Sequence, residues 1–548
     1  MCTLPTRPQH KPAYFLQIKE YTMQPTGHML IGAAEVFGPG AELRAINPAT
    51  NETIAPPFGG GGANEVDRAA GLAAEAFDIY SRTAPEVRAL FLERIATNLE
   101  ANAPEIVERC MLETGLPRPR LEGEVSWTAG QLRLFADVVR RGLWRTATLV
   151  SADPKRAGGP RPDMRMHKVA LGPVGVFGAS NFPILYSIAG GDTASALAAG
   201  APVVCRAHPS HPGTSELVGR AIRDAVAESG LPEGVFSLVT GAGHELGEAL
   251  VDHPEIKAIA FTGSEAGGMA IYRRGQQRAE PIPVFAEMAS VNPHFLLPAA
   301  QAARAEAFAV RFVEQMVAGV GQMCLKPGIV LAIEGEGFDV LRATLVDRLA
   351  SAAAQTMLSP GIHGNYERGV GRTRGSAGVT EIARGQRGEG PFDGEALLFE
   401  VNAGAVIADM RVAEEVFGPM ALLIRCASLD EMHEVARHLR GQLSIVVHLD
   451  DADVDLARTL MPVFERKTGR IIANSFSNVV EICDAQIHGG PFPATTDPRF
   501  TSVGSSAIDR FLRPVAYQDI PASLLPPTLQ DDNPLGIWRV RDGRPAQA

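Results

Sequence analysis

The chain lacks the cysteine patterns and the long apolar runs that mark several protein classes. Its six cysteines are scattered over 548 residues, with no CxxC pair and no zinc-ligand spacing, so they indicate thiols of a reducing compartment and not a disulfide framework. No run of 18 apolar residues is present, and no transmembrane helix is expected. The first 21 residues lack the apolar core of a signal peptide, which makes the cytoplasm the expected compartment.

Basic residues are fewer than acidic ones, and aromatic residues are also few. Lys and Arg number 51 against 62 Asp and Glu, and the net charge of −11 argues against nucleic acid as a partner because the surface repels phosphate. Aromatic residues make up only 6% of the chain, whereas 56 glycines and 40 prolines are present. Hydrophobic residues account for 45%, which is typical of a folded globular protein. The positions of the glycines and prolines must therefore decide whether they indicate disorder or tight turns.

Apolar runs and alanine-rich segments alternate between residues 169 and 263. The predicted strands are residues 174–177, 203–205, 235–239 and 256–261. The predicted helices between them are residues 189–199, 215–229 and 246–251. This order is typical of parallel βαβ units with both faces of the sheet covered. Glycine and proline lie at the joints, which indicates turns and not disorder.

Patterned regions also lie on both sides of this one. An apolar stripe at Val87, Phe91, Ile95 and Leu99 predicts a helix, and helical patterns run on to Thr114 and from residue 127 to 144. A second alternating region covers residues 291–491, with predicted strands at residues 330–333, 421–424 and 444–448. Residues 151–168 and 502–518 belong to neither region. The sequence therefore predicts an α/β protein with two domains and an extra connecting element.

Residue types beyond the needs of packing occur in three places. Asn181 follows the predicted strand at 174–177, and its amide could stabilise an oxyanion beyond the strand ends, although Ser180 or Asn181 could instead cap a helix. Cys324 lies in a glycine-flanked loop and is either a nucleophile or a buried structural thiol. Glu287 follows the apolar residues 282–286 and is either a base or an ordinary surface or helix-start carboxylate.

Two other patterns carry less weight. The glycines from Gly241 to Gly247 have the spacing GxGxxxG, which is not the GxGxxG fingerprint of dinucleotide-binding proteins. His208 and His211 resemble a metal motif, but no carboxylate or cysteine is placed to complete the site. No metal is therefore expected.

From about His28 onward the chain resembles the aldehyde dehydrogenase superfamily in five motifs that occur in the same order. The motifs are FGASNFP with Asn181, FTGS at 261–264, EMASVNP from Glu287, GQMC ending at Cys324 and EVFGP at 415–419. Within the superfamily the chain is most similar to bacterial NADP-dependent 2,5-dioxovalerate (α-ketoglutaric semialdehyde) dehydrogenases and to related fatty aldehyde dehydrogenases. The segments behind this similarity are residues 190–200, 207–215, 488–495, 511–515 and 533–538.

The resemblance implies a Rossmann-like cofactor domain, an α/β catalytic domain and a β extension for oligomerisation. The expected parts are an N-terminal extension (1–28), the cofactor domain (29–150 and 169–286), the catalytic domain (287–495), the oligomerisation element (151–168 and 496–520) and a C-terminal tail (521–548). A homodimer or homotetramer is expected. The resemblance also implies that Cys324 forms a thioester with the substrate, that Asn181 binds the oxyanion and that Glu287 activates the hydrolytic water.

The implied cofactor is NADP or NAD. The implied cofactor-binding residues are Phe177, Gly178, Ala179, Ser180, Arg206, His208, Ser210, Gly241, Thr262, Gly263, Ser264, Glu415 and Phe417. Arg206 replaces a lysine that many relatives carry at the adenosine ribose, and Pro209 replaces their glutamate, which makes a 2′-phosphate tolerable and favours NADP. Arg206, Ser210 and His244 are the expected contacts of that phosphate. Ala289 replaces a usual glycine, and its methyl group is expected to alter the backbone φ beside Glu287.

The expected substrate is a small aldehyde, namely 2,5-dioxopentanoate or a similar semialdehyde, which is oxidised to the carboxylate. Candidate pocket residues are His488, Phe492 and Asn474, and no arginine can be assigned to the substrate carboxylate from the sequence. One alternative is an NADP-dependent medium- or long-chain fatty aldehyde dehydrogenase. A CoA-acylating aldehyde dehydrogenase is a further alternative, but such enzymes lack the hydrolytic glutamate, and Glu287 argues against it. The last alternative is a relative that has lost its activity and only binds ligands. The presence of Cys324, Asn181 and Glu415 argues against this alternative.

Overall fold

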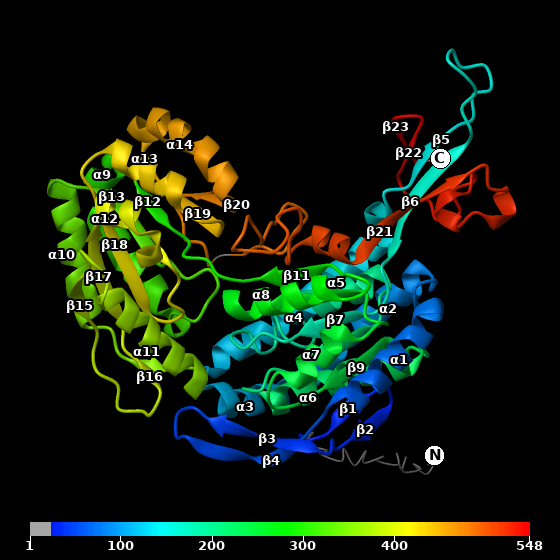
Figure 1. Ribbon diagram of the computed structural model, residues 1–548, viewed down its shortest axis with the longest axis horizontal. Coiled ribbons are helices and arrows are strands. Elements are labelled where there is room, and N and C mark those ends of the chain that lie inside the picture. Colours follow the sequence, from blue (N-terminus) through cyan, green and yellow to red (C-terminus); the bar gives the residue numbers. More distant parts are fainter. Residues whose placement is uncertain (1–23, 479, 548) are drawn as a thin grey trace, which may run out of the picture.

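The chain forms two sheet-centred lobes and a projecting arm (Figure 1). This computed structural model describes residues 24–478 and 480–547. Most of the expected N-terminal extension, residues 1–23, lies outside the described residues. Within the described ranges, no helix combines the length and the apolar character that crossing a membrane requires.

The first lobe is built on a seven-stranded sheet with the order β11-β10-β7-β8-β9-β1-β2. Its strands are β1 (Met29–Ile31), β2 (Ala34–Val36), β7 (Val174–Phe177), β8 (Val203–Arg206), β9 (Phe236–Val239), β10 (Ala258–Thr262) and β11 (Val284–Glu287). β7 to β11 pair in parallel, whereas β1 pairs with β9 in the antiparallel sense. The four predicted strands of this region are thus confirmed, because their fully apolar runs suit a sheet covered on both faces.

Helices cover this sheet on both faces. They are α1 (Ala63–Tyr80), α2 (Pro85–Ala101), α3 (Ala103–Thr114), α4 (Arg118–Arg141), α5 (Gly191–Ala199), α6 (Pro212–Glu228), α7 (Glu245–Asp252) and α8 (Glu265–Gln277). In α2, Phe91, Ile95 and Leu99 are buried as predicted, but Val87 is 41% exposed because it lies in the first turn, beyond the buried stripe. The helix predicted at residues 127–144 starts earlier, since proline is tolerated in a first turn, and ends at Arg141, where Gly142 takes a left-handed conformation.

The second lobe has another seven-stranded sheet, with the order β15-β17-β18-β13-β12-β19-β20. Its strands are β12 (His294–Leu296), β13 (Ile329–Ile333), β15 (Thr380–Arg384), β17 (Leu397–Asn402), β18 (Met420–Cys426), β19 (Gln442–His448) and β20 (Thr468–Ala473). Its helices are α9 (Pro298–Val317), α10 (Glu336–Ala350), α11 (Pro360–Arg374), α12 (Ala403–Ala408), α13 (Leu429–His438) and α14 (Val454–Lys467). All but the edge strand β15 run parallel, and the three strands predicted here are confirmed.

The arm is a five-stranded sheet with the order β21-β6-β5-β22-β23. Its strands are β5 (Thr148–Val150), β6 (Met164–Ala170), β21 (Leu512–Gln518), β22 (Arg539–Arg541) and β23 (Arg544–Ala546). Seven residue pairs join β6 to β21 in the antiparallel sense, so the two segments set apart in the sequence do lie together. The C-terminal tail, expected as a separate part, adds β22 and β23 to the same sheet. Two further sheets have two strands each. In one, β3 (Gly40–Asn47) pairs with β4 (Glu52–Gly60), and in the other, β14 (Gln355–Thr356) pairs with β16 (Asp393–Gly394).

The two lobes bring their strand ends to a common cleft. Parallel pairing of β10 with β11 places Thr262 beside Glu287 at the carboxyl edge of the first sheet. The loop between α9 and β13 brings Cys324 to the same edge from the second lobe. Ligands of open parallel sheets bind at such an edge, so the fold alone marks this cleft as the candidate site.

Candidate active site

Cys324 lies in a loop whose backbone packs closely against that of Gly418. After α9 the chain makes a 3₁₀ turn, Ala318–Gly321, in which Gly319, Val320 and Gly321 all have positive φ. A Cβ atom on Gly321 would lie 2.4 Å from the carbonyl carbon of Gly418, so only glycine fits there. This backbone bend directs the chain into the cleft just before Cys324.

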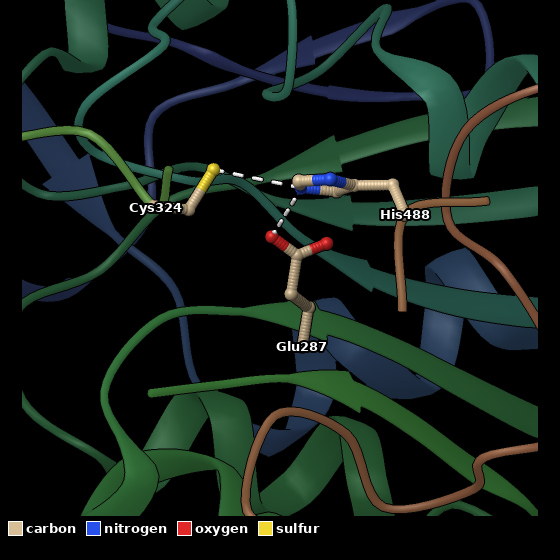
Figure 2. Close-up of side chains that lie close together, drawn as sticks. All are labelled: Glu287, Cys324 and His488. Atoms are coloured by element: carbon tan, nitrogen blue, oxygen red, sulfur yellow. Dashed lines mark hydrogen bonds and ion pairs between the residues drawn. The ribbon is translucent and has the colours of Figure 1, made fainter. Parts of the chain in front are cut away.

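Glu287 and His488 meet the thiol of Cys324 (Figure 2). Sγ of Cys324 lies 3.5 Å from Nε2 of His488, and the same nitrogen lies 2.9 Å from Oε1 of Glu287. The hydroxyl of Ser502 donates to the other carboxylate oxygen, Oε2, at 2.6 Å. The three side chains come from positions up to 201 residues apart, and together they form a continuous path for a proton between thiol and carboxylate.

The surroundings shift the proton affinities of this group in opposite directions. Burial, and then the Glu287 and Glu415 carboxylates, hold the pKa of the Cys324 thiol well above its ordinary value. Burial would also raise the pKa of Glu287, but the adjacent His488 and the hydroxyl of Ser502 outweigh it and hold this pKa below the ordinary value. The resting site therefore holds a protonated thiol beside an ionised carboxylate.

Asn181 lies next to this group. Its side-chain Nδ2 donates to the carbonyl oxygen of Gln322 at 3.1 Å, which leaves the second N–H of the amide for another acceptor. The alternative prediction, that Ser180 or Asn181 caps a helix, is wrong, because α5 begins only at Gly191 with Gly190 as its cap. Asn181 and Cys324 line the same cleft.

Sequence reasoning did not find Asn292, which holds the loop of Cys324 in place. Its Nδ2 donates to the carbonyl oxygens of Cys324, at 2.8 Å, and of Lys326, at 3.0 Å. Asn292 has a positive φ of 45°, which asparagine tolerates better than most residues. The asparagine of the EMASVNP segment was the signal that could have indicated such a role.

Lys326 was also missed. Its buried Nζ donates to the carbonyl oxygens of Val416, at 3.2 Å, and Met420, at 2.7 Å, and so joins the Cys324 loop to the segment that carries Glu415. Burial lowers the pKa of Lys326 and raises that of Glu415, while the attraction between the two charges opposes both shifts. A lysine two residues after the cysteine is the only sequence signal of this link.

A cleft of about 1450 Å³ runs from the thiol along the edge of the first sheet. Ten of the residues predicted to bind cofactor line it: Phe177, Gly178, Ser180, Arg206, His208, Thr262, Gly263, Ser264, Glu415 and Phe417. Three do not, namely Ala179, Ser210 and Gly241. Ala179 is fully buried, the N–H of Ser210 bonds to Nδ1 of His208, and Gly241 packs against Leu246 and Gly61.

The cleft has the features that a dinucleotide requires. At the start of α8, Ser264 caps the helix by accepting from the N–H of Gly267, and the free N–H groups of this first turn favour a phosphate. Glu265, which would repel a phosphate, is paired with Arg440 at 2.6 Å. At the other end, Nη2 of Arg206 donates to the carbonyl of Gly243, and its buried Nε has no partner among the described residues. His244 and Pro209 lie in the same part of the cleft.

Of the three residues predicted to line the substrate pocket, one lies in the site and two do not. His488 lies at the centre of the site, whereas Asn474 and Phe492 are absent from the lining of the cleft. The side chain of Asn474 bonds to the backbone of Leu449 and to Arg304, so it shapes a turn, and Phe492 is 50% exposed beside Arg440. Ala289 lines the cleft and is not among the residues with a positive φ, and its expected effect on the backbone beside Glu287 stays a prediction.

An arginine that the sequence could not assign lies beside Asn181. Arg120, near the start of α4, donates from Nη2 to the carbonyl oxygen of Asn181 at 2.6 Å and lies over the ring of Phe182 at 4.9 Å. Its Nε is paired with the buried Glu124 at 3.2 Å. Nη1 points toward Gly319, where an added Cβ would approach it to 2.6 Å. Arg120 therefore lies against the backbone of Asn181, although it is not among the residues that line the cleft.

The side chains with metal-binding donor atoms include the two histidines that resemble a metal motif in the sequence. His208 and His211 stack at 5.5 Å between ring centroids, and Nε2 of His211 is bonded to the carbonyl of Ala179. Over residues 24–478 and 480–547, the one set of three side chains with donor atoms close enough for a shared ion is Glu287, Cys324 and His488.

Comparison with known proteins agrees with this geometry. The sequence model of the aldehyde dehydrogenase family matches residues 37–490. The chain is 51% identical to alpha-ketoglutaric semialdehyde dehydrogenase 2 of Azospirillum brasilense, over 95% of this chain and all of the relative. It is 41% identical to alpha-ketoglutaric semialdehyde dehydrogenase of Acinetobacter baylyi, over 94% of this chain and 98% of the relative.

Solved structures show the same fold. A mutant of aldehyde dehydrogenase C from Pseudomonas syringae, complexed with NAD+ and octanal, has a TM-score of 0.75 at 24% identity and covers 90% of this chain and 97% of its own. The NADP-dependent glyceraldehyde-3-phosphate dehydrogenase of Bacillus halodurans, complexed with NADP, has a TM-score of 0.76 at 22% identity, with coverage of 90% and 98%. At these identities the likeness concerns the fold alone.

Proposed function

The chain belongs to the aldehyde dehydrogenase family, and from that premise we propose that it oxidises 2,5-dioxopentanoate, or a semialdehyde of similar size and charge, to the carboxylate. The protein is an NAD(P)-dependent aldehyde dehydrogenase. The observation that most directly supports this substrate is the 51% identity, over nearly the whole chain, to a relative that is named for this activity. The positive charge of Arg120 beside Asn181 supports a substrate with an anionic end.

The contacts of Cys324 support its role as the nucleophile. The thiol gives its proton toward Oε1 of Glu287 through Nε2 of His488, and Sγ then forms a bond to the aldehyde carbon. The free N–H of the Asn181 amide and the backbone N–H of Cys324 bind the oxyanion that results. When bound, the nicotinamide cofactor supplies the acceptor for the hydride. This leaves an acyl group on Sγ as a thioester.

Glu287 has the second role, in hydrolysis. The proton taken up from the thiol first leaves Glu287 for solvent along the cleft that this residue lines. The ionised carboxylate then takes a proton from a water molecule, whose oxygen attacks the thioester carbon. The C–S bond breaks, the leaving thiolate of Cys324 takes its proton back from Glu287 through His488, and the product acid loses a proton to solvent and leaves as a carboxylate. Ser502 and His488 keep Glu287 ionised and aimed at the thiol during this step.

We further propose that NADP is preferred over NAD. Arg206 lines the cleft, where we assign its guanidinium to the 2′-phosphate of the adenosine ribose, and the neighbouring Pro209 brings no carboxylate that would repel this phosphate. His208 and His244 line the same part of the cleft, and Ser210 does not. Thr262, Gly263 and Ser264 are assigned to the pyrophosphate and Glu415 to the nicotinamide ribose.

A panel of aldehydes assayed with NAD and with NADP tests the substrate. 2,5-Dioxopentanoate should have a higher kcat/KM than pentanal, which has the same chain length and no charge. Replacement of Arg120 by Gln should reduce kcat/KM for 2,5-dioxopentanoate by about 10- to 100-fold, the value of a charged hydrogen bond, and change that for pentanal far less. Equal losses for both aldehydes would assign Arg120 to holding Asn181 in place. A preference of the wild type for pentanal or longer neutral aldehydes would contradict the proposed substrate.

A further inference from the structure

The thiol, imidazole and carboxylate at the centre of the site are also three ligands of the kind that zinc takes in proteins. Sγ of Cys324 and Nε2 of His488 are 3.5 Å apart, Nε2 and Oε1 of Glu287 are 2.9 Å apart, and all three atoms lie within 4.8 Å of one another (Figure 2). In a tetrahedral zinc site with ordinary bond lengths, ligand atoms are separated by about 3.4–3.6 Å. The Sγ–Nε2 pair already has this separation, and the Nε2–Oε1 pair must open by about 0.5 Å to admit an ion.

The charges and the surroundings favour an ion here. One thiolate and one carboxylate together balance the two positive charges of Zn²⁺, so the assembly of ion and ligands is neutral, and a neutral assembly is less costly to bury at low dielectric than an unpaired carboxylate. The outer oxygen of Glu287 accepts from the hydroxyl of Ser502, which fixes the carboxylate as the outer contacts of metal ligands commonly do. Glu287 and Cys324 both line the cleft, so an ion has a path to them.

We propose that Cys324, His488 and Glu287 bind one Zn²⁺ ion in the resting enzyme and that the bound ion masks the nucleophile. Sγ exchanges its proton for the metal, and that proton goes to solvent. His488 binds through Nε2, with its remaining ring proton on Nδ1, and Oε1 of Glu287 is the third ligand. The fourth position is left for a water molecule, as in sites that stay open to exchange. The ion is thus a reversible inhibitor that also shields the thiol from alkylation and oxidation.

Metal binding is measured directly, without an activity assay. Wild-type protein should take up one Zn²⁺ per chain in competition with a chromophoric chelator. With Co²⁺ as the probe it should show a thiolate-to-cobalt charge-transfer band and the intense visible bands of a tetrahedral site. Cys324→Ala, His488→Asn and Glu287→Gln should each weaken Zn²⁺ binding by more than about 100-fold, and Ser502→Ala by about 10-fold, because it removes only the support of one ligand.

The half-buried Cys483 provides the matched control, because it is a second free thiol outside the site. Cys483→Ser should bind Zn²⁺ as the wild type does, and Zn²⁺ should protect Cys324, but not Cys483, from iodoacetamide. Unchanged Zn²⁺ affinity in Cys324→Ala, or a cobalt complex without the charge-transfer band, would overturn the proposal. These readouts do not depend on the substrate, so failure of the proposed aldehyde oxidation would leave the zinc result intact, and the reverse also holds.

Discussion

Each of the three reactive side chains lies in a different part of the sequence and depends on contacts that only the fold supplies. Cys324 needs a base because desolvation and two carboxylates hold its pKa high, and His488 links it to the carboxylate of Glu287. Ser502, from the segment that leads into the arm, fixes the far oxygen of that carboxylate. The chemistry therefore depends on hydrogen bonds between segments about 164 to 215 residues apart.

The pH dependence of hydrolysis should respond to Ser502. Because His488 and Ser502 hold the pKa of Glu287 below its ordinary value, the base stays ionised, and hydrolysis persists, down to low pH. In Ser502→Ala this pKa rises, so the acidic limb of the kcat–pH profile should move to higher pH. Arg510, which also lowers the pKa, and Cys324 remain in place in this variant. Ser502→Thr retains a hydroxyl and should restore the wild-type limb, and an unmoved limb in Ser502→Ala would contradict the role of this contact.

At this scale the sequence indicated candidate reactive residues, which the fold brings together, but not the residues that support them. Cys324, Glu287 and Asn181 were each ambiguous alone and became convincing through the order of five motifs. Asn292, Lys326 and Arg120 were not predicted, because each holds the site through backbone carbonyl oxygens, and no side-chain pattern reveals such contacts. The prediction that Asn474 lines the substrate pocket failed for the same reason, since the side-chain amide of Asn474 bonds to the backbone of Leu449 and shapes a turn.

At the scale of elements, the turn between α9 and β13 is the critical connection. Gly321 has a φ of +62°, and its backbone lies against that of Gly418, next to the Glu415 segment. Lys326 joins the same two segments from the other side of Cys324. The nucleophile and the proposed ribose contact are thereby parts of one packed unit.

Gly321→Ala should destabilise this unit. The left-handed conformation alone costs a residue with a Cβ about 1–2 kcal/mol, and the contact with the Gly418 backbone adds to it. The midpoint of thermal unfolding should fall, and kcat should fall with it. Gly130→Ala is the control, since Gly130 lies inside α4 with open space around it, and alanine there should raise helix stability by about 0.5–1 kcal/mol. An unfolding midpoint for Gly321→Ala at or above that of the wild type would rule out the strain.

The elements themselves were largely predictable. Fully apolar runs and alanine-rich helices marked seven strands correctly, because parallel strands buried on both faces carry no polar positions. The ends were less predictable: α4 begins nine residues before the predicted start, since its first turns are rich in charged residues and bury only Leu121 and Val125 as apolar positions. Short strands such as β22 and β23 gave no pattern at all.

At the scale of the whole molecule, the arm stands away from both lobes (Figure 1). Among the described residues its outer strand β21 pairs with β6 alone, and Arg513, Pro514 and Ala516 are exposed. An unpaired strand edge is a ready site for a second chain. The glycines and prolines, abundant in the sequence, lie mainly at joints and at the cleft, as the turn interpretation predicted.

The arm should therefore support a homo-oligomer. Light scattering coupled to size-exclusion chromatography should give a mass of two or four times 58.2 kDa. Ala516→Pro, which removes a backbone donor at this edge, should shift the mass toward that of one chain if β21 forms the contact. A wild-type mass of one chain at micromolar concentration would contradict the assembly.

The central claim is that oxidation proceeds through a thioester on Cys324 that Glu287 hydrolyses. Glu287→Gln, incubated with 2,5-dioxopentanoate and NADP and then quenched in acid, tests it by mass spectrometry of the digested protein. Because His488 still accepts the thiol proton in this variant, the account predicts that about one acyl group per active site accumulates on the peptide that contains Cys324, together with a single burst of NADPH. Steady turnover of NADPH with no acyl group on Cys324, or an acyl group on another residue, would contradict it.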